Sequence, residues 1–240
     1  PAGNAGAAAT TEDYDVDTRE PSVIRVVITD AARDRNSFLN AGDVLTLTAF
    51  FTESVIVDNT SGNPTLTHVV GSTSLNATYT SGSGGTALLF QYTTLAGETD
   101  TNGISIVSNA IALNSSTIRD AAGNNASLTH NAVSHNGSYM VDTTPPAVST
   151  VRITGGGSYM MNNFLNASDN TGADVVSTTV TFDDTVEVEN TPQLTLSVGD
   201  DNHTANYVSS GSGLKTKLFK YTIQAGDNDT DGISFENNVL

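Results

Sequence analysis

Short stretches in which apolar and polar residues alternate recur along the chain and predict β-strands. The clearest stretches are residues 23–29, 44–51, 87–94, 194–198 and 217–223. Each is rich in β-branched or aromatic side chains, which favour strands. Clusters of Gly, Asn, Asp and Ser separate such stretches at intervals of about ten residues, the spacing typical of a β-sandwich. No stretch shows the period of an amphipathic helix, so the pattern predicts an all-β protein.

The chain carries two copies of one module. Residues 93–105 (TTLAGETDTNGIS) match residues 222–234 (TIQAGDNDTDGIS) at eight of thirteen positions, and residues 51–60 align with residues 182–191. An internal repeat of this kind predicts two similar domains in tandem. The predicted parts are an N-terminal strand and linker at 1–20, module one at 21–143 and module two at 144–240.

Aromatic residues occupy matched positions in the two modules and are predicted to fill the cores or to pair across strands. They are Tyr79, Phe90 and Tyr92 in module one, and Tyr207, Phe219 and Tyr221 in module two. The glycine-rich segment 80–86 links two predicted strands, which predicts a hairpin turn.

Several motifs resemble those of a known family. The linker VDTTPP (141–146), the segment FTESV (51–55), the turn RDAAGNNA (119–126) and the loop AGDNDTDGIS (225–234) resemble the bacterial immunoglobulin-like repeats of large secreted adhesins and surface proteins. The resemblance covers almost the whole chain. It implies two tandem immunoglobulin-like β-sandwiches outside the cell, stiffened by Ca²⁺, that serve adhesion to other cells or surfaces, or surface structure, rather than catalysis.

The charge balance restricts the possible partners. The chain has 9 basic and 26 acidic residues, a net charge of −17, and no cysteine. Such a charge disfavours nucleic acid and anionic lipid as partners and favours divalent cations. No apolar run approaches the roughly 18 residues of a membrane-spanning helix, so we expect no membrane insertion.

One acidic loop predicts a calcium site in module two. Asp227, Asp229 and Asp231 alternate along the loop and precede Gly232, so their carboxylates can converge on a cation that prefers oxygen ligands. The counterparts in module one are Glu98, Asp100 and Asn102, which predict weaker binding. The alternative is a turn whose Asp and Asn side chains cap their own backbone.

The family resemblance implies a second calcium site at the junctions between modules. The residues carried over are Asp142 of the linker, Asp120 and Asn124 of the turn 119–126, and Glu53 with its module-two counterpart Asp184. Module two has no counterpart of Asp120 or Asn124. Alternatively, Glu53 and Asp184 are exposed charges that discourage association between sheets.

The start of the chain resembles the closing strand of module one. Residues 13–18 (DYDVDT) correspond to residues 138–143 (SYMVDT), whereas module two of this sequence ends at the equivalent of Ile111. A sandwich without its last strand exposes unpaired backbone. We therefore predict that the N-terminal strand of one copy completes module two of a neighbouring copy. Because donor and acceptor surfaces differ, such contacts propagate head-to-tail as a filament.

Alternate residues of this donor strand should face the same side of the sheet. The strand comprises Asp13, Tyr14, Asp15, Val16 and Asp17. We expect Tyr14 and Val16 to enter the neighbour's core, and the aspartates to face solvent or an ion at the junction. The alternative is that the sequence is a window of a longer tandem adhesin, in which the modules act as spacers.

Catalysis finds little support in the sequence. The histidines lie at unmatched positions and are interpreted as scattered surface residues; they are His68, His130, His135 and His203. No nucleophile elbow or phosphate-binding loop occurs. A carbohydrate-binding or hydrolytic module remains a further alternative. It would need an exposed aromatic platform or a carboxylate pair in a cleft, and the absence of Trp disfavours it.

Overall fold

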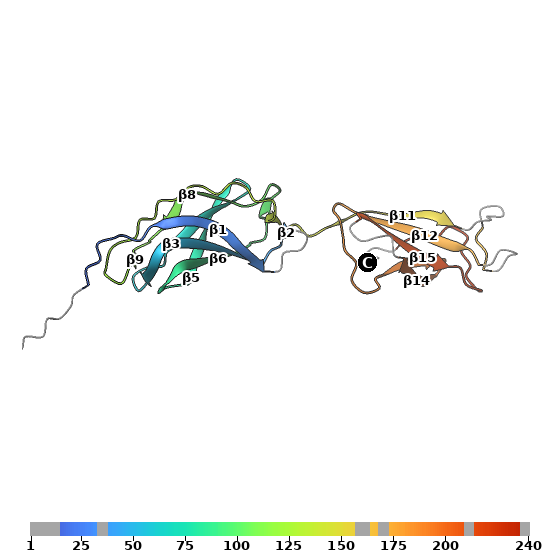
Figure 1. Ribbon diagram of the computed structural model, residues 1–240. Coiled ribbons are helices and arrows are strands. Elements are labelled where there is room, and N and C mark those ends of the chain that lie inside the picture. The colour runs from blue at the N-terminus through green and yellow to red at the C-terminus, as the bar shows by residue number, and fades with distance from the viewer. Residues whose placement is uncertain (1–14, 33–37, 157–163, 168–172, 209–213, 236–240) are drawn as a thin grey trace, which may run out of the picture. The chain divides into compact units, whose positions relative to one another are not determined.

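Every regular element in the part of the chain that the structure describes is a β-strand (Figure 1). This computed structural model describes residues 15–32, 38–156, 164–167, 173–208 and 214–235. The chain divides into two compact units, Pro1–Thr144 and Pro145–Leu240. The described residues include no helix that is long and apolar enough to cross a membrane. The prediction of an all-β protein with sandwich-like domains is confirmed.

Unit 1 contains a large antiparallel sheet and a small sheet of three strands. Across the large sheet the order is β1 (Val23–Ala32), β3 (Val44–Asp58), β6 (Gly85–Thr93), β5 (Thr73–Ser81), β4 (Thr65–Val70) and β8 (Ser105–Ala112), while β9 (Thr117–Arg119) pairs with the far end of β3. The small sheet has the order β2 (Phe38–Leu39), β10 (Met140–Asp142) and β7 (Thr99–Asp100).

The core of unit 1 includes side chains from both sheets. Alternation along β3 turns Leu45 and Leu47 inward, and both are fully buried. Leu39 of β2 and Val141 of β10 belong to the same cluster and are fully buried as well. Two layers of strands thus enclose one apolar core, as expected of a sandwich.

Unit 2 repeats five of these strands in the same order. They are β11 (Val148–Gly156), β12 (Val175–Phe182), β15 (Thr216–Thr222), β14 (Asp201–Val208) and β13 (Gln193–Val198), the counterparts of β1, β3, β6, β5 and β4. Among the described residues of unit 2, no strand corresponds to β8, β9 or β10. The five stretches selected from the alternation pattern fall in β1, β3, β6, β13 and β15, and only their last residues Thr94 and Ile223 lie one position beyond a strand.

The predicted aromatic pairs are confirmed in both units. Tyr79 of β5 lies opposite Phe90 of β6, with ring centroids 5.9 Å apart in an edge-to-face arrangement. Tyr207 and Phe219 repeat this pair in unit 2 at 5.7 Å. Segment 80–86 connects β5 to β6 as the predicted hairpin.

The two units differ at the far end of one strand. β3 continues to Asp58, where Val57 pairs with Ile118 of β9. Its counterpart β12 stops at Phe182, and residues 183–192 form no strand. A strand needs a neighbour for its backbone hydrogen bonds. The extension of β3 therefore depends on β9, which has no counterpart in the described part of unit 2.

The interpretation of the histidines as surface residues is wrong for two of them. His68 is fully buried in β4 beside the ring of Tyr92. His130 is also buried, and its Nε2 accepts a 2.8 Å hydrogen bond from the backbone amide of Ala110. Both histidines therefore belong to the structure of unit 1.

Candidate strand-binding groove and acidic cluster

In unit 1, β10 closes the sandwich by lying between two strands. Val141 pairs with Leu39 of β2 in parallel and with Asp100 of β7 in the antiparallel sense. Its side chain is fully buried, and Tyr139 packs against the same core. The backbone amide of Ile104 donates to the carbonyl of Tyr139 at 2.9 Å. β10 thus fills a slot that the rest of unit 1 would otherwise leave open.

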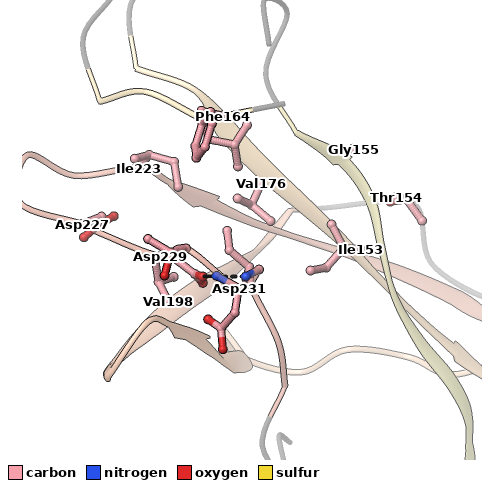
Figure 2. Close-up of a pocket in the computed structure, with 14 residues that line it drawn as sticks. Ile153, Thr154, Gly155, Phe164, Val176, Val198, Ile223, Asp227, Asp229 and Asp231 are labelled. Atoms are coloured by element: carbon pink, nitrogen blue, oxygen red, sulfur yellow. Dashed lines mark hydrogen bonds between the residues drawn. The ribbon is translucent and has the colours of Figure 1, made fainter. Parts of the chain in front are cut away.

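In unit 2, a groove of about 630 Å³ opens between β11, β12 and the loop residues 227–233. Figure 2 shows apolar side chains around it and aspartates along one side. The apolar residues are Ile153, Phe164, Leu165, Val176, Val198, Ile223 and Ile233, and the acidic residues are Asp227, Asp229 and Asp231. Phe164 at the rim is 66% exposed and Ile153 is 41% exposed, so apolar surface remains open to solvent.

The groove of unit 2 lies where β10 lies in unit 1. Residues 164–167 and 38–41 share the sequence FLNA, so Leu165 corresponds to Leu39, the parallel neighbour of Val141. In the repeat, Asp229 corresponds to Asp100, the antiparallel neighbour of Val141. Both walls that hold β10 in unit 1 therefore line an open groove in unit 2. The FLNA repeat is the sequence signal that would have located this wall.

The segment predicted to act as a donor strand is only partly described. Asp13 and Tyr14 lie outside the described residues. Asp15, Val16 and Asp17 belong to no strand and are exposed, and Val16 is 83% exposed. Its sequence counterpart Val141 is fully buried.

A second groove, of about 270 Å³, lies at the far end of unit 2. Val186 and Val188 line it, and they correspond to Val55 and Val57 of β3. In unit 1, β9 covers this position. Lys217, which replaces the buried Leu88 of unit 1, also lines the groove and is itself buried.

Three acidic residues far apart in sequence lie close together in unit 1, near the start of β1. Asp17, Glu53 and Asp120 each place one carboxylate oxygen within 4.8 Å of the others. Asn124 joins them, because its side-chain amide donates to the carbonyl of Asp17 at 3.2 Å and to the carboxylate of Asp120 at 2.8 Å. The structure thus brings together four residues of the predicted metal set, where the N-terminal segment 15–20 meets β3 and the turn 119–126.

The electrostatics of this cluster keep Asp120 charged. Burial acts to raise the pKa of its carboxyl group, but hydrogen bonds from Asn124 and from nearby backbone amides outweigh burial and lower the pKa. An ionised carboxylate beside two others repels them unless a cation lies between them. Carboxylate and carbonyl oxygens are the ligands that Ca²⁺ prefers.

The predicted convergence of the loop carboxylates in unit 2 does not occur. Within the described residues, only the cluster at Asp17 groups three acidic or histidine side chains within 4.8 Å. Asp229 instead accepts hydrogen bonds from the backbone amides of Gly199, Asp231 and Gly232, at 3.0, 3.1 and 2.6 Å. Asp231 is exposed. This geometry is that of the alternative interpretation, a turn in which an Asp side chain caps backbone amides.

The loop of unit 1 has the same internal bonds. Asp100 is buried and accepts from the amides of Gly71, Asn102 and Gly103. Glu98 accepts from the hydroxyl of Tyr92 and from the amide of Leu95. These oxygens satisfy backbone amides that a tight loop would leave unpaired, and the loops serve as walls of the β10 slot.

The remaining predicted ligands cap local turns. Asp142 accepts from the amide of Thr144 at 3.0 Å, and Asp184 accepts from the amide of Thr185 at 2.6 Å. In unit 2 it is Asp183, next to Asp184, that accepts from the amide of Ala147 at 2.7 Å and so ties the linker to the unit.

Comparisons with known proteins return no relatives. No family model matches the chain, and neither the curated proteins nor the solved structures include a significant match. The fold and the sites therefore define the class: an all-β protein of two sandwich-like units, one closed by its own last strand and one with an open groove at the same position.

Proposed function

We propose that the chain is a non-enzymatic structural subunit of an extracellular filament. In this proposal, the strand at residues 13–17 of one copy enters the groove of unit 2 in the next copy. The observation that carries the proposal is the coincidence of this groove with the position of β10 in unit 1. The sequence of the strand, DYDVD, matches the segment SYMVD that fills the slot in unit 1.

Burial of apolar surface supplies the driving force. Val16 exposes most of its side chain, and the groove exposes Phe164 and Ile153. Burying an aliphatic side chain of this size contributes about 1.5–3 kcal/mol. Backbone pairing on both sides adds hydrogen bonds of the kind that bind added strands at sheet edges. Because each copy carries one donor and one acceptor, the contact repeats and produces a filament.

Calcium is proposed to stiffen the connection between the donor strand and the rest of unit 1, which we call the joint. The cluster of Asp17, Glu53 and Asp120 lies at the base of the donor strand, so a bound Ca²⁺ would hold the strand in a fixed direction as it leaves unit 1. A rigid joint lowers the entropy lost when the strand binds. Other cells or surfaces are the proposed partners of the assembled filament.

Two alternatives are retained. In a spacer of a longer adhesin, a later segment of the same chain would occupy the groove of unit 2. A carbohydrate-binding module would present an aromatic platform, but among the described residues Phe164 is the one aromatic residue that is mostly exposed. Phe164 lies at the groove itself.

Electron microscopy and light scattering of the full chain test the proposal. The wild type should form filaments, and Val16→Asp should remain monomeric, because burying an unpaired carboxylate costs several kcal/mol. Val107→Asp, at another exposed valine, is the matched control and should still polymerise. Filaments that form equally well with Val16→Asp would refute strand addition and favour the spacer alternative.

A further inference from the structure

We infer that Thr18 is a hydrogen-bonding latch that sets the register of the incoming strand, an inference that rests on the proposed function. Its counterpart in unit 1 is Thr143, which follows β10 directly. The hydroxyl of Thr143 accepts from the backbone amide of Gly97 at 2.8 Å and donates to the carbonyl of Glu98 at 2.9 Å. Thr143 is buried, so both bonds are shielded from water.

The receiving loop of unit 2 has the same shape as the loop that holds Thr143. Gly226 and Gly97 share a left-handed backbone, with φ of 103° and 91°. In each loop the acidic residue that follows accepts from a tyrosine hydroxyl: Asp227 from Tyr221, and Glu98 from Tyr92. The amide of Gly226 and the carbonyl of Asp227 therefore occupy the positions that bind the threonine hydroxyl in unit 1.

The turn that contains Thr18 already has the geometry of the turn at Thr143 in the unbound chain. The carboxylate of Asp17 accepts from the amide of Arg19 at 3.0 Å. Asp142 makes the same bond to the amide of Thr144, also at 3.0 Å. The turn that presents Thr143 to its loop is thus already present around Thr18, and a preformed turn loses less entropy on binding.

The latch and the alternating sequence together select one register. A shift by one residue would move Thr18 away from Gly226 and turn Asp15 or Asp17 toward the apolar groove in place of Val16. Burying an unpaired carboxylate is strongly unfavourable. The correct register instead places Val16 between Leu165 and Asp229, as Val141 lies between Leu39 and Asp100.

The test uses full-length Val16→Asp protein, whose own strand cannot dock, as the acceptor. Labelled peptides of residues 9–20 with Thr, Ser or Val at position 18 are titrated by fluorescence anisotropy. The Thr and Ser peptides should bind within about threefold of each other, while the Val peptide should bind about tenfold more weakly, because two hydrogen bonds are lost. Hydrogen exchange at the Gly226 amide should slow with the Thr and Ser peptides and not with the Val peptide.

Equal binding of the Val and Thr peptides would overturn the latch and leave strand addition in place. Failure of all three peptides to bind would overturn both the latch and the proposed function. Because the Val side chain has nearly the shape of Thr, a loss confined to the Val peptide reports on the hydroxyl rather than on packing.

Discussion

The hydroxyl of Tyr221 donates a 2.7 Å hydrogen bond to a carboxylate oxygen of Asp227. Tyr92 and Glu98 repeat this bond in unit 1. Burial, together with the bond to Asp227, raises the pKa of Tyr221, so the phenol stays protonated and remains a donor. The acidic loop therefore keeps its shape through internal bonds, and in the proposed complex that shape would present the backbone amide of Gly226 to Thr18.

Tyr221→Phe should loosen this loop. Removing the donor leaves the Asp227 carboxylate with fewer partners and is expected to cost about 1–2 kcal/mol of the stability of unit 2. Hydrogen exchange followed by mass spectrometry of segment 214–235 measures the effect. Tyr207→Phe is the matched control, because Tyr207 packs against Phe219 and does not belong to the acidic loop. Equal exchange in the two variants would show that the bond does not hold the loop.

Asp229→Ala should destabilise unit 2 to the same extent with calcium and with chelator. Its carboxylate caps backbone amides, and the bonds from Gly199 and then Gly232 lower its pKa below the ordinary value of 3.8. We expect a loss of about 1–2 kcal/mol, since the loop is partly exposed. Denaturant unfolding in the two buffers measures it, and a loss seen only with calcium would restore the metal-ligand interpretation.

The lowered pKa of Asp229 also predicts the direction of a pH effect. A carboxyl group with a lowered pKa in the folded state contributes stability above its ordinary pKa and loses it as the pH falls through the folded value. The contribution of Asp229 should therefore be complete above about pH 4 to 5 and decline at lower pH. The difference in stability between wild type and Asp229→Ala should shrink over the same range.

Unit 1 should lose stability on mild acidification because of His68. Burial lowers the pKa of His68 from 6.5 to about 4, so the unfolded chain takes up a proton first as the pH falls. Stability should fall between pH 6.5 and pH 4, by up to roughly 3 kcal/mol. His68→Leu, which introduces the residue of the unit 2 counterpart Leu196, should remove this dependence. Hydrogen exchange of segment 44–112 at several pH values measures this stability in the wild type and in His68→Leu. The same pH profile in both proteins would contradict the prediction.

Calcium removal should lower the melting temperature of the wild type through the cluster of Asp17, Glu53 and Asp120. Glu53→Gln keeps the shape of the side chain and removes one charge, so it should reduce the calcium-dependent shift and weaken binding by about tenfold. Asp184→Asn is the matched control at the unit 2 counterpart. Differential scanning calorimetry with calcium and with chelator measures the shift, and an identical response of all three proteins would exclude this cluster.

Assembly should accelerate as the salt concentration rises. The donor strand carries three aspartates, and three more line the groove that receives it. At 0.1 M salt, repulsion between exposed charges more than about 10 Å apart is largely screened. Light scattering at 20 and 200 mM NaCl measures the rate of filament growth, and a slower rate at higher salt would contradict this arrangement.

The sequence alone determined the strands, the repeat and the match between the N-terminal segment and the closing strand of unit 1. These features depend only on the order of neighbouring residues. Alternation predicts a strand because successive side chains in a strand point to opposite faces. The aromatic pairs followed because residues at matched positions of a repeat occupy matched positions in its fold.

Only the tertiary structure decided which groups meet. One of the three amides that Asp229 accepts from is that of Gly199, thirty residues away along the chain. The spacing of acidic residues predicted a cation site, whereas the fold places a capped turn there. Asp17, Glu53 and Asp120 come from a linker, a strand and a turn, and only the packing of those elements brings their carboxylates together. Alternation along β4 places His68 on the same inward face as Leu66 and Val70, but its contact with the ring of Tyr92 on β6 arises only from the pairing of the strands.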